Sequence, residues 1–178
     1  MISEALTYIT NDLNTYFKNR LQTTEDKVVL SGILDQDGAV SIQGENKIAI
    51  TLVNVCKDTV AKNSTSFIPA GAVANAAPVH LSFDVLFSAY FNSTEYAGAL
   101  KYLSFVIDYF QAKCVFTKDS AAGLDPNIAR ISFDLSSLDF AALNQVWATL
   151  GAKYMPSVVY KMRMETFNTT WVVDAVSV

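Results

Sequence analysis

Charged side chains are scarce in this sequence, and histidine and cysteine are scarcer still. Its 178 residues include 13 Lys and Arg, 17 Asp and Glu, one His and two Cys, with a net charge of −4. An acidic chain without a run of Lys or Arg is a poor match for nucleic acid or an anionic membrane surface. The sequence also lacks the ~20 consecutive apolar residues that a membrane-spanning helix needs. We therefore expect neither a nucleic-acid partner nor a membrane span.

The sequence motifs of enzymes and metal sites are missing as well. Cys56 and Cys114 lie far apart without metal-ligand spacing, and the lack of an export signal at the N-terminus favours buried free thiols over a disulfide. His80, on the polar face of an expected strand, has no Cys, His or Asp companion at motif spacing. The Asp35–Gly38 string lacks the further ligands of a calcium loop. There is no phosphate-binding glycine loop and no nucleophile elbow. We expect a non-enzymatic protein without a cofactor or a metal, although active sites also assemble from distant residues.

Apolar and aromatic residues are abundant, and their spacing predicts both helices and strands. Hydrophobic residues make up 51% of the chain and aromatic residues 12%, which is typical of a globular domain with a sheet. We expect one domain over 1–178, with a mixed, largely antiparallel α+β sheet packed by about three helices. In chain order the expected elements are a helix over 2–21, strands over 28–34, 47–55 and 79–91, a helix from the Asn92–Glu95 cap to about 113, strands over 114–117 and 130–135, a helix before Gly151, a strand over 157–167 and a final strand or tail over 171–178.

Two of the expected helices carry specific predictions. In the last helix, Trp147 shares one face with three aliphatic residues, so we expect it to anchor the core between helix and sheet. Ser136 or Ser137 is a candidate N-cap, and Gly151 suits the left-handed conformation just past the helix end. For the helix that ends near 113, the helical spacing predicts a buried face made of Ala97, Leu100, Leu103, Ile107 and Phe110.

The expected strand over 157–167 has one apolar face and one charged face. Val158, Tyr160, Met162 and Met164 alternate with Val159, Lys161, Arg163 and Glu165. A mixed-charge strip of this kind is either the solvated face of an antiparallel sheet or a row of ion pairs between subunits. Both interpretations remain open, and the second makes Lys161, Arg163 and Glu165 candidate interface residues.

A second candidate interface lies in the irregular segment over 57–78. Compact domains rarely keep structureless loops longer than about 12–15 residues unless the loop binds something. Phe67, Ile68 and Val73 would be poorly placed in plain solvent. The segment either folds back on its own domain or contacts a neighbouring subunit or partner protein.

The stretch from the last helix into the charged strand resembles a known family. It carries the pattern W-x-x-L-G-x-x-Y-x-P-S-V-x-Y-x-x-R, made of Trp147, Leu150, Gly151, Tyr154, Pro156, Ser157, Val158, Tyr160 and Arg163. Two further segments are similar too: the opening helix, and residues 86–90 followed by the helix over 100–110. The pattern resembles the cap, or tail-terminator, proteins of extracellular contractile injection systems, the phage-tail-like particles of the antifeeding-prophage kind. The matching residues are structural rather than catalytic.

The resemblance implies a structural function. It implies a homo-oligomeric ring, with six copies in this family, on the distal end of the inner tube, where the ring ends polymerisation of tube and sheath. Assembly would take place in the cytoplasm, and the chain would then remain in the injection particle. The alternative is a non-enzymatic adaptor or assembly chaperone for tube or effector proteins of the same particle. Some relatives carry a further C-terminal segment, so we expect any function of that segment to lie outside this sequence.

Overall fold

A six-stranded sheet and three α-helices make up the part of the chain that the computed structural model describes, residues 1–58 and 81–166. In chain order these elements are α1 (Ile2–Leu21), β1 (Val28–Leu30), β2 (Lys47–Lys57), β3 (Leu81–Tyr90), α2 (Tyr96–Ala112), β4 (Val115–Thr117), β5 (Ile128–Leu135), α3 (Phe140–Leu150) and β6 (Ser157–Thr166). A short 3-10 helix, η2 (Ser93–Glu95), leads into α2. The expected final strand or tail over 171–178 lies outside the described residues.

The strands follow the order β1-β2-β3-β6-β5-β4 across the sheet. β1 pairs with β2 in parallel, whereas every other neighbouring pair is antiparallel. β6, the last of the described strands, therefore lies between β3 and β5 at the centre of the sheet. The mixed, largely antiparallel α+β architecture expected from the sequence is confirmed.

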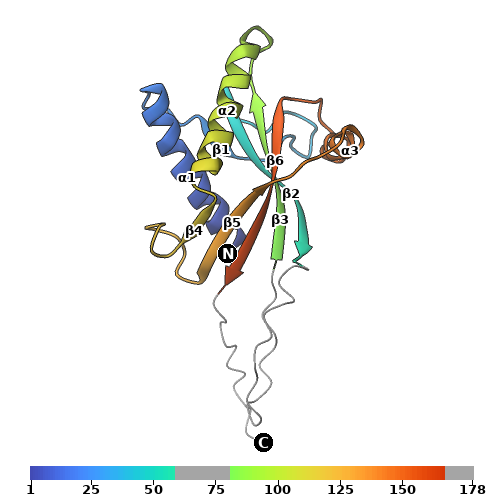
Figure 1. The fold of residues 1–178 in the computed structure, drawn as a ribbon. Coiled ribbons are helices and arrows are strands. Elements are labelled where there is room, and N and C mark those ends of the chain that lie inside the picture. The colour runs from blue at the N-terminus through green and yellow to red at the C-terminus, as the bar shows by residue number, and fades with distance from the viewer. Residues whose placement is uncertain (59–80, 167–178) are drawn as a thin grey trace, which may run out of the picture.

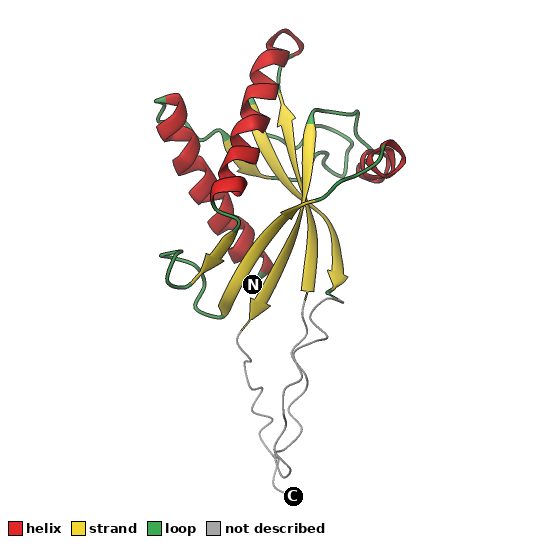
Figure 2. Ribbon diagram, viewed as in Figure 1, coloured by secondary structure: helices red, strands yellow, loops and turns green. Residues whose placement is uncertain are grey.

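Helices cover both faces of the sheet. α1 and α2 lie together on one face, and α3 stands alone on the other side (Figures 1 and 2). The alternation in β6 follows this arrangement, because Tyr160, Met162 and Met164 belong to the large core that α1 and α2 line. Val159 points the other way, into a smaller cluster that includes Trp147 of α3.

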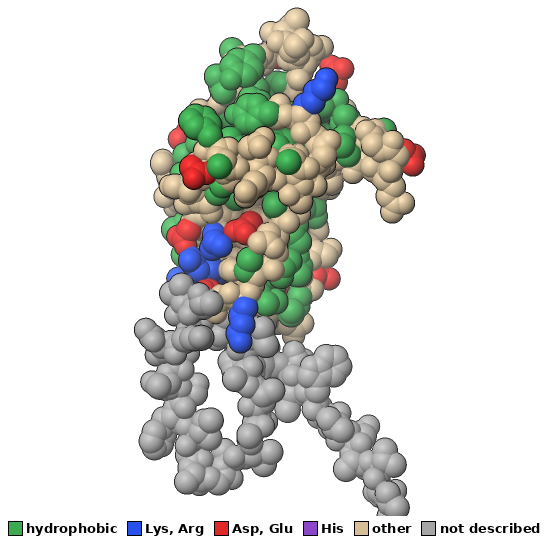
Figure 3. Space-filling model, turned by 90° about the vertical axis from the view of Figure 1, so that its right-hand side faces the viewer, with side chains coloured by type: hydrophobic (Ala, Val, Ile, Leu, Met, Phe, Trp, Pro, Cys, Tyr) green, Lys and Arg blue, Asp and Glu red, His purple; other side chains and the backbone are tan. Residues whose placement is uncertain are grey.

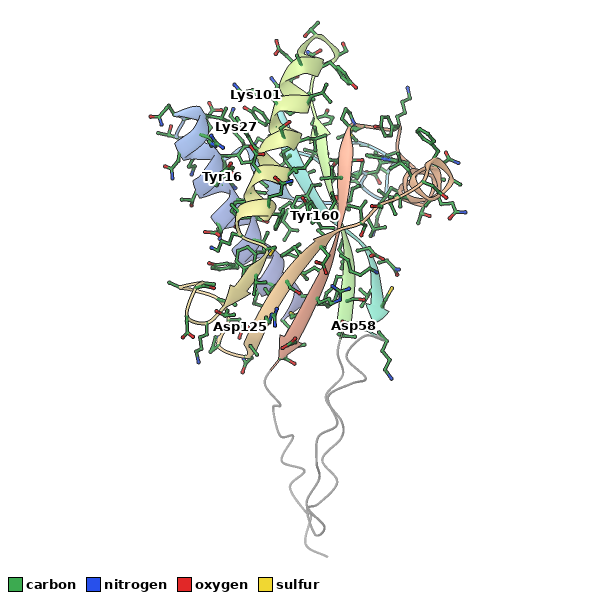
Figure 4. All side chains as sticks on the ribbon, viewed as in Figure 1. Tyr16, Lys27, Asp58, Lys101, Asp125 and Tyr160 are labelled. Atoms are coloured by element: carbon green, nitrogen blue, oxygen red, sulfur yellow. The ribbon has the colours of Figure 1, made fainter. Side chains whose placement is uncertain are left out.

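Aromatic rings fill the large core. The ring of Phe110 in α2 lies with its centroid 4.6 Å from that of Tyr160 and 5.2 Å from that of Phe87. Tyr160 is labelled beside the middle of α2 in Figure 4, where the strands cross in this view. This burial raises the pKa of Tyr160 to about 12. The side of the sheet that packs against α1 and α2 is therefore a well-packed, largely aromatic core.

Two polar residues of α1 fasten the helix to its neighbours. Asn14 is buried, and its Oδ1 accepts hydrogen bonds from the backbone N–H of Lys27 and of Val28, both at 2.9 Å. Its Nδ2 donates to the carbonyl oxygen of Val28 at 2.7 Å. The Asp12 carboxylate accepts a hydrogen bond from the hydroxyl of Tyr109 and, at 2.8 Å, one from Nζ of Lys113. Burial, together with the hydrogen bond to Asp12, raises the pKa of Tyr109.

The structure corrects three details of the sequence-based predictions. β1 ends at Leu30 rather than near 34, because the chain turns away to form a loop. The N-cap of α3 is Asp139, whose Oδ1 accepts from the backbone N–H of Ala142 at 2.7 Å, and not Ser136 or Ser137. The buried face of α2 is also turned relative to the prediction. It consists of Ala99, Leu103, Val106, Tyr109 and Phe110.

Because the buried face of α2 is turned, two of the predicted core residues lie largely outside the core. Leu100 is 45% exposed, and Ala97 is exposed too. Apolar residues cover most of the circumference of this helix, so more than one apolar face satisfies the helical spacing. The contact of Tyr109 with Asp12 helps to decide which of them turns inward.

Candidate interaction surfaces

The predicted charged strip on β6 lies on the face of the sheet away from α1 and α2. Its side chains meet carboxylates from neighbouring strands within the same chain. Nζ of Lys161 lies 3.1 Å from Oδ1 of Asp84 on β3. Arg163 forms an ion pair with Asp134 of β5, and its Nε lies 3.3 Å from Oδ2 of Asp58, without hydrogen-bond geometry. Figure 4 labels Asp58 at the lower end of the described sheet.

These ion pairs follow the strand register. Asp84 and Asp134 are the direct register partners of Lys161 on its two sides, so three neighbouring strands contribute to one polar cluster. Asn54 on β2 extends the cluster, because its Nδ2 donates to Oδ2 of Asp84 at 3.2 Å. Sequence reasoning found Lys161 and Arg163 but not these partners, whose contribution depends on a strand order that alternation alone does not reveal.

Glu165 differs from the two basic residues of the strip. It is exposed, and its register partner on the neighbouring strand β5 is Arg130. The Arg163 side chain, by contrast, is 31% exposed and has two carboxylate neighbours. Of the three charged candidates on β6, Glu165 therefore offers the most accessible charge to another molecule.

The other three candidate interface residues, Phe67, Ile68 and Val73, lie outside the described residues. So does His80. Whether the 57–78 segment folds back or contacts a neighbour stays a prediction.

A second surface is formed around α3, and it is apolar. Trp147 is buried against Leu86, Ala49 and Val159, as the helical spacing predicts, while Phe140 is 91% exposed and Tyr154 is 62% exposed. The Tyr154 ring packs edge-to-face on Trp147, with centroids 5.8 Å apart. We define the α3 surface as Phe140, Leu143, Asn144, Trp147 and Tyr154, which line a hollow of about 400 Å³.

A further hollow is bordered by the loop that joins α3 to β6. It measures about 420 Å³ and is bordered mainly by apolar side chains, among them Ile33, Val40, Tyr90 and Met155, with Lys153 also on its lining. Figure 3 faces the α3 side and shows green side chains spread over its upper half. Blue and red side chains gather together lower down, nearer the grey segments. On this flank the charged side chains thus cluster mainly in the lower part, while apolar side chains occur over its whole height.

Neither surface carries the groups of a metal site. Within residues 1–58 and 81–166, no three His, Cys, Asp or Glu side chains come close enough together to hold a metal ion. Cys56 and Cys114 are both free thiols, and Cys114 is exposed rather than buried as expected. Over the same residues, no helix combines the length and the apolar character needed to cross a bilayer.

Comparison with known proteins identifies the family. The model of the Pvc16 N-terminal domain matches residues 5–175, nearly the whole chain. This chain belongs to the Pvc16 N-terminal domain family. Among proteins with curated descriptions, none matches it by sequence.

Solved structures share the fold of this Pvc16 N-terminal domain. One is the sheath/tube terminator, in the extended state, of an extracellular contractile injection system named PVC. It is 16% identical, with a TM-score of 0.53 over 88% of this chain and 56% of the other. Another is the tube-terminating cap of the anti-feeding prophage, 13% identical, with a TM-score of 0.50 over 96% of this chain and 58% of the other. The resemblance to cap proteins is thus confirmed, and the chain spans little more than half the length of each matched structure.

Proposed function

We propose that this chain is a structural, non-enzymatic cap that ends the inner tube and sheath of a contractile injection particle. The observation that carries the proposal is the match of the Pvc16 N-terminal domain model over residues 5–175. The shared fold with a sheath/tube terminator and a tube-terminating cap supports it. The described residues add a compact domain with two surfaces suited to protein contacts.

The physical task of such a cap follows from the way tubes grow. A tube subunit adds through a heterologous contact that does not close, so each added ring presents the same surface again. A terminator binds the last ring and offers no equivalent surface to the next one. In our proposal the chain forms a closed homo-oligomeric ring, a hexamer by the family resemblance, and contacts both tube and sheath proteins. The whole chain over 1–178 acts as one tail-terminator-like domain that is assembled in the cytoplasm and stays with the particle.

The candidate contacts of the cap are the two regions singled out in the sequence. Phe67, Ile68 and Val73 would supply apolar contacts from the 57–78 segment. Lys161, Arg163 and Glu165 would supply polar contacts from the outer face of β6, with Glu165 the most accessible of the three.

Electron microscopy of purified particles tests this assignment directly. Particles that contain this chain with an affinity tag would be labelled with gold-conjugated antibody, and particles with an untagged chain serve as the control. A cap predicts label at one end of each particle. If particle yield depends on the chain but purified particles contain none of it, the chain is an assembly chaperone or adaptor instead.

A further inference from the structure

α3 differs from the other two helices because it carries no charge and is poorly covered. Its sequence, Phe-Ala-Ala-Leu-Asn-Gln-Val-Trp-Ala-Thr-Leu, contains no acidic or basic residue, and Trp147 is its one buried side chain. The start of the helix projects Phe140 outward with 91% of the residue exposed. Soluble proteins rarely leave contiguous apolar surface of this kind uncovered unless another molecule binds there. A partner for the α3 surface must therefore be apolar itself.

The described chain carries a matching apolar surface on α2. Tyr96 is 59% exposed and Leu100 is 45% exposed, and with Ala97 they share one outward stripe of the helix. We define these three residues as the α2 surface. These three residues lie away from the buried face of α2, which packs on α1 and the sheet. They are therefore not part of the core of the described chain.

The two surfaces are placed as a head-to-tail contact requires. The first turns of α2 and the whole of α3 lie on opposite flanks of the sheet, both toward the same end of the molecule (Figures 1 and 2). Lys101 is labelled near the upper part of α2 in Figure 4. Copies standing side by side around a ring axis would thus bring the α3 flank of one copy toward the α2 flank of the next, with the first turns of α2 somewhat above α3 in the view of Figure 1. A closed ring uses such a pair of different surfaces once at every interface.

Charge at the margins of the two surfaces is complementary. Asp139 stands at the start of α3, and Lys101 follows Leu100 on α2. In the described part of the chain, neither side chain is in an ion pair. Asp139 accepts a hydrogen bond from the Ala142 N–H, and Nζ of Lys101 lies 5.7 Å from the centroid of the Phe105 ring. Opposite charges beside two apolar surfaces favour one orientation of a contact.

We propose that the α3 surface of one copy binds the α2 surface of a neighbouring copy, with a side chain of the α2 surface seated in the hollow between Phe140 and Tyr154. This contact rests on the proposed cap function, which supplies the ring, and specifies which surfaces close it. The partner is a second copy of this chain, bound through an uncharged, aromatic contact flanked by the pair Asp139 and Lys101.

Cross-linking inside assembled particles tests the contact. The chain would carry Phe140→Cys and Leu100→Cys together, in a background with Cys56→Ser and Cys114→Ser, and particles would be treated with a short bismaleimide. Adjacent copies should then appear on denaturing gels as a ladder of dimer, trimer and larger multiples. Each single cysteine variant should yield no more cross-linked product than the cysteine-free background.

Two outcomes would overturn the proposal. A dimer from Phe140→Cys alone would show that α3 meets α3 of the next copy. No ladder from the double variant, in particles that contain the chain, would show that the two surfaces do not meet. A matched control pairs Phe140→Cys with Val55→Cys, since Val55 is 48% exposed on β2, outside both surfaces. Particles that lack even the wild-type chain would contradict the cap function itself, so the two failures are distinguishable.

Discussion

Trp147 is the residue on which the attachment of α3 depends. Trp147 is only 4% exposed, and it is the one buried residue of α3. Trp→Ala in a core costs about 3–5 kcal/mol of unfolding free energy, and a domain of this size loses roughly 2–4 °C of melting temperature per kcal/mol. Trp147→Ala should therefore lower the melting temperature by roughly 10 °C. Melting by circular dichroism measures the loss.

Trp147→Phe is the control for Trp147→Ala, because the indole N–H makes no hydrogen bond within the described residues that the control would lose. Nε1 of Trp147 is buried without a hydrogen-bond partner in the described structure. Trp147→Phe removes this donor and keeps most of the ring, so it should lower the melting temperature much less than Trp147→Ala. Equal losses in the two variants would contradict the account of Trp147 as a packing residue.

Two buried tyrosines give the fold a defined response to alkaline pH. Burial raises the pKa of Tyr160 to about 12, and burial with the Asp12 hydrogen bond raises that of Tyr109, against an ordinary value of 10. The folded chain therefore holds these phenolic protons more tightly than the unfolded chain does. Their contribution to stability is complete below pH 10 and is lost as the pH rises through the folded values. Urea unfolding between pH 9 and about 12 measures this decline.

The tyrosine prediction has a matched pair of variants. Tyr160→Phe should make stability fall less steeply between pH 10 and 12, because one of the shifted groups is gone. Tyr154→Phe, at a residue that is 62% exposed, serves as the control and should keep the wild-type slope. The same slope in all three proteins would refute the role of Tyr160.

At the scale of elements, Asn14 of α1 holds the start of β1. Its amide side chain makes three hydrogen bonds to the backbone of Lys27 and Val28. Asn14→Ala would leave buried backbone groups unpaired, at about 1–3 kcal/mol for each group that water does not reach. We expect a loss of stability and faster hydrogen exchange at the Val28 amide. Asn19→Ala, at an exposed position on the same helix, should change neither quantity.

The elements also show how far sequence patterns reach. The period-two alternation of β6 was sufficient to assign Val158–Met164 to two faces, because successive side chains of a strand point to opposite faces and one face of β6 packs in the core beneath α1 and α2. The α2 pattern was not sufficient, since that helix is apolar around most of its surface. The ion pairs of Lys161 and Arg163 could not be predicted either, because Asp84, Asp134 and Asp58 come from distant parts of the chain.

Some residues of the candidate surfaces could likewise be predicted from the sequence, whereas others could not. Glu165 was predictable as an outward charge from the alternation of its own strand. Phe140 and Tyr154 were not recognised as exposed, since their large apolar side chains suggest a core. Only the placement of α3 beside the sheet shows that Trp147 is its one fully buried side chain, with Leu143 and Leu150 partly buried in the same cluster.

At the scale of the whole molecule, Glu165 tests the polar contact of the proposed ring. It is exposed, and exposed charges contribute little to the stability of a monomer. Glu165→Lys should therefore leave the melting temperature within about 2 °C of wild type while lowering the fraction of capped particles. Glu45→Lys, at another exposed glutamate, is the control. Normal capping by Glu165→Lys would show that Glu165 takes no part in the interface.

The central claim is that this chain ends polymerisation. Tube and sheath subunits add through repeated identical contacts, and nothing in such contacts counts copies. The most direct measurement is the length distribution of particles from cells that lack this gene, compared with cells that carry it on a plasmid. A cap predicts irregular lengths and unstable sheaths without the gene, and recovery when the gene is restored. An unchanged length distribution with stable sheaths would contradict the account.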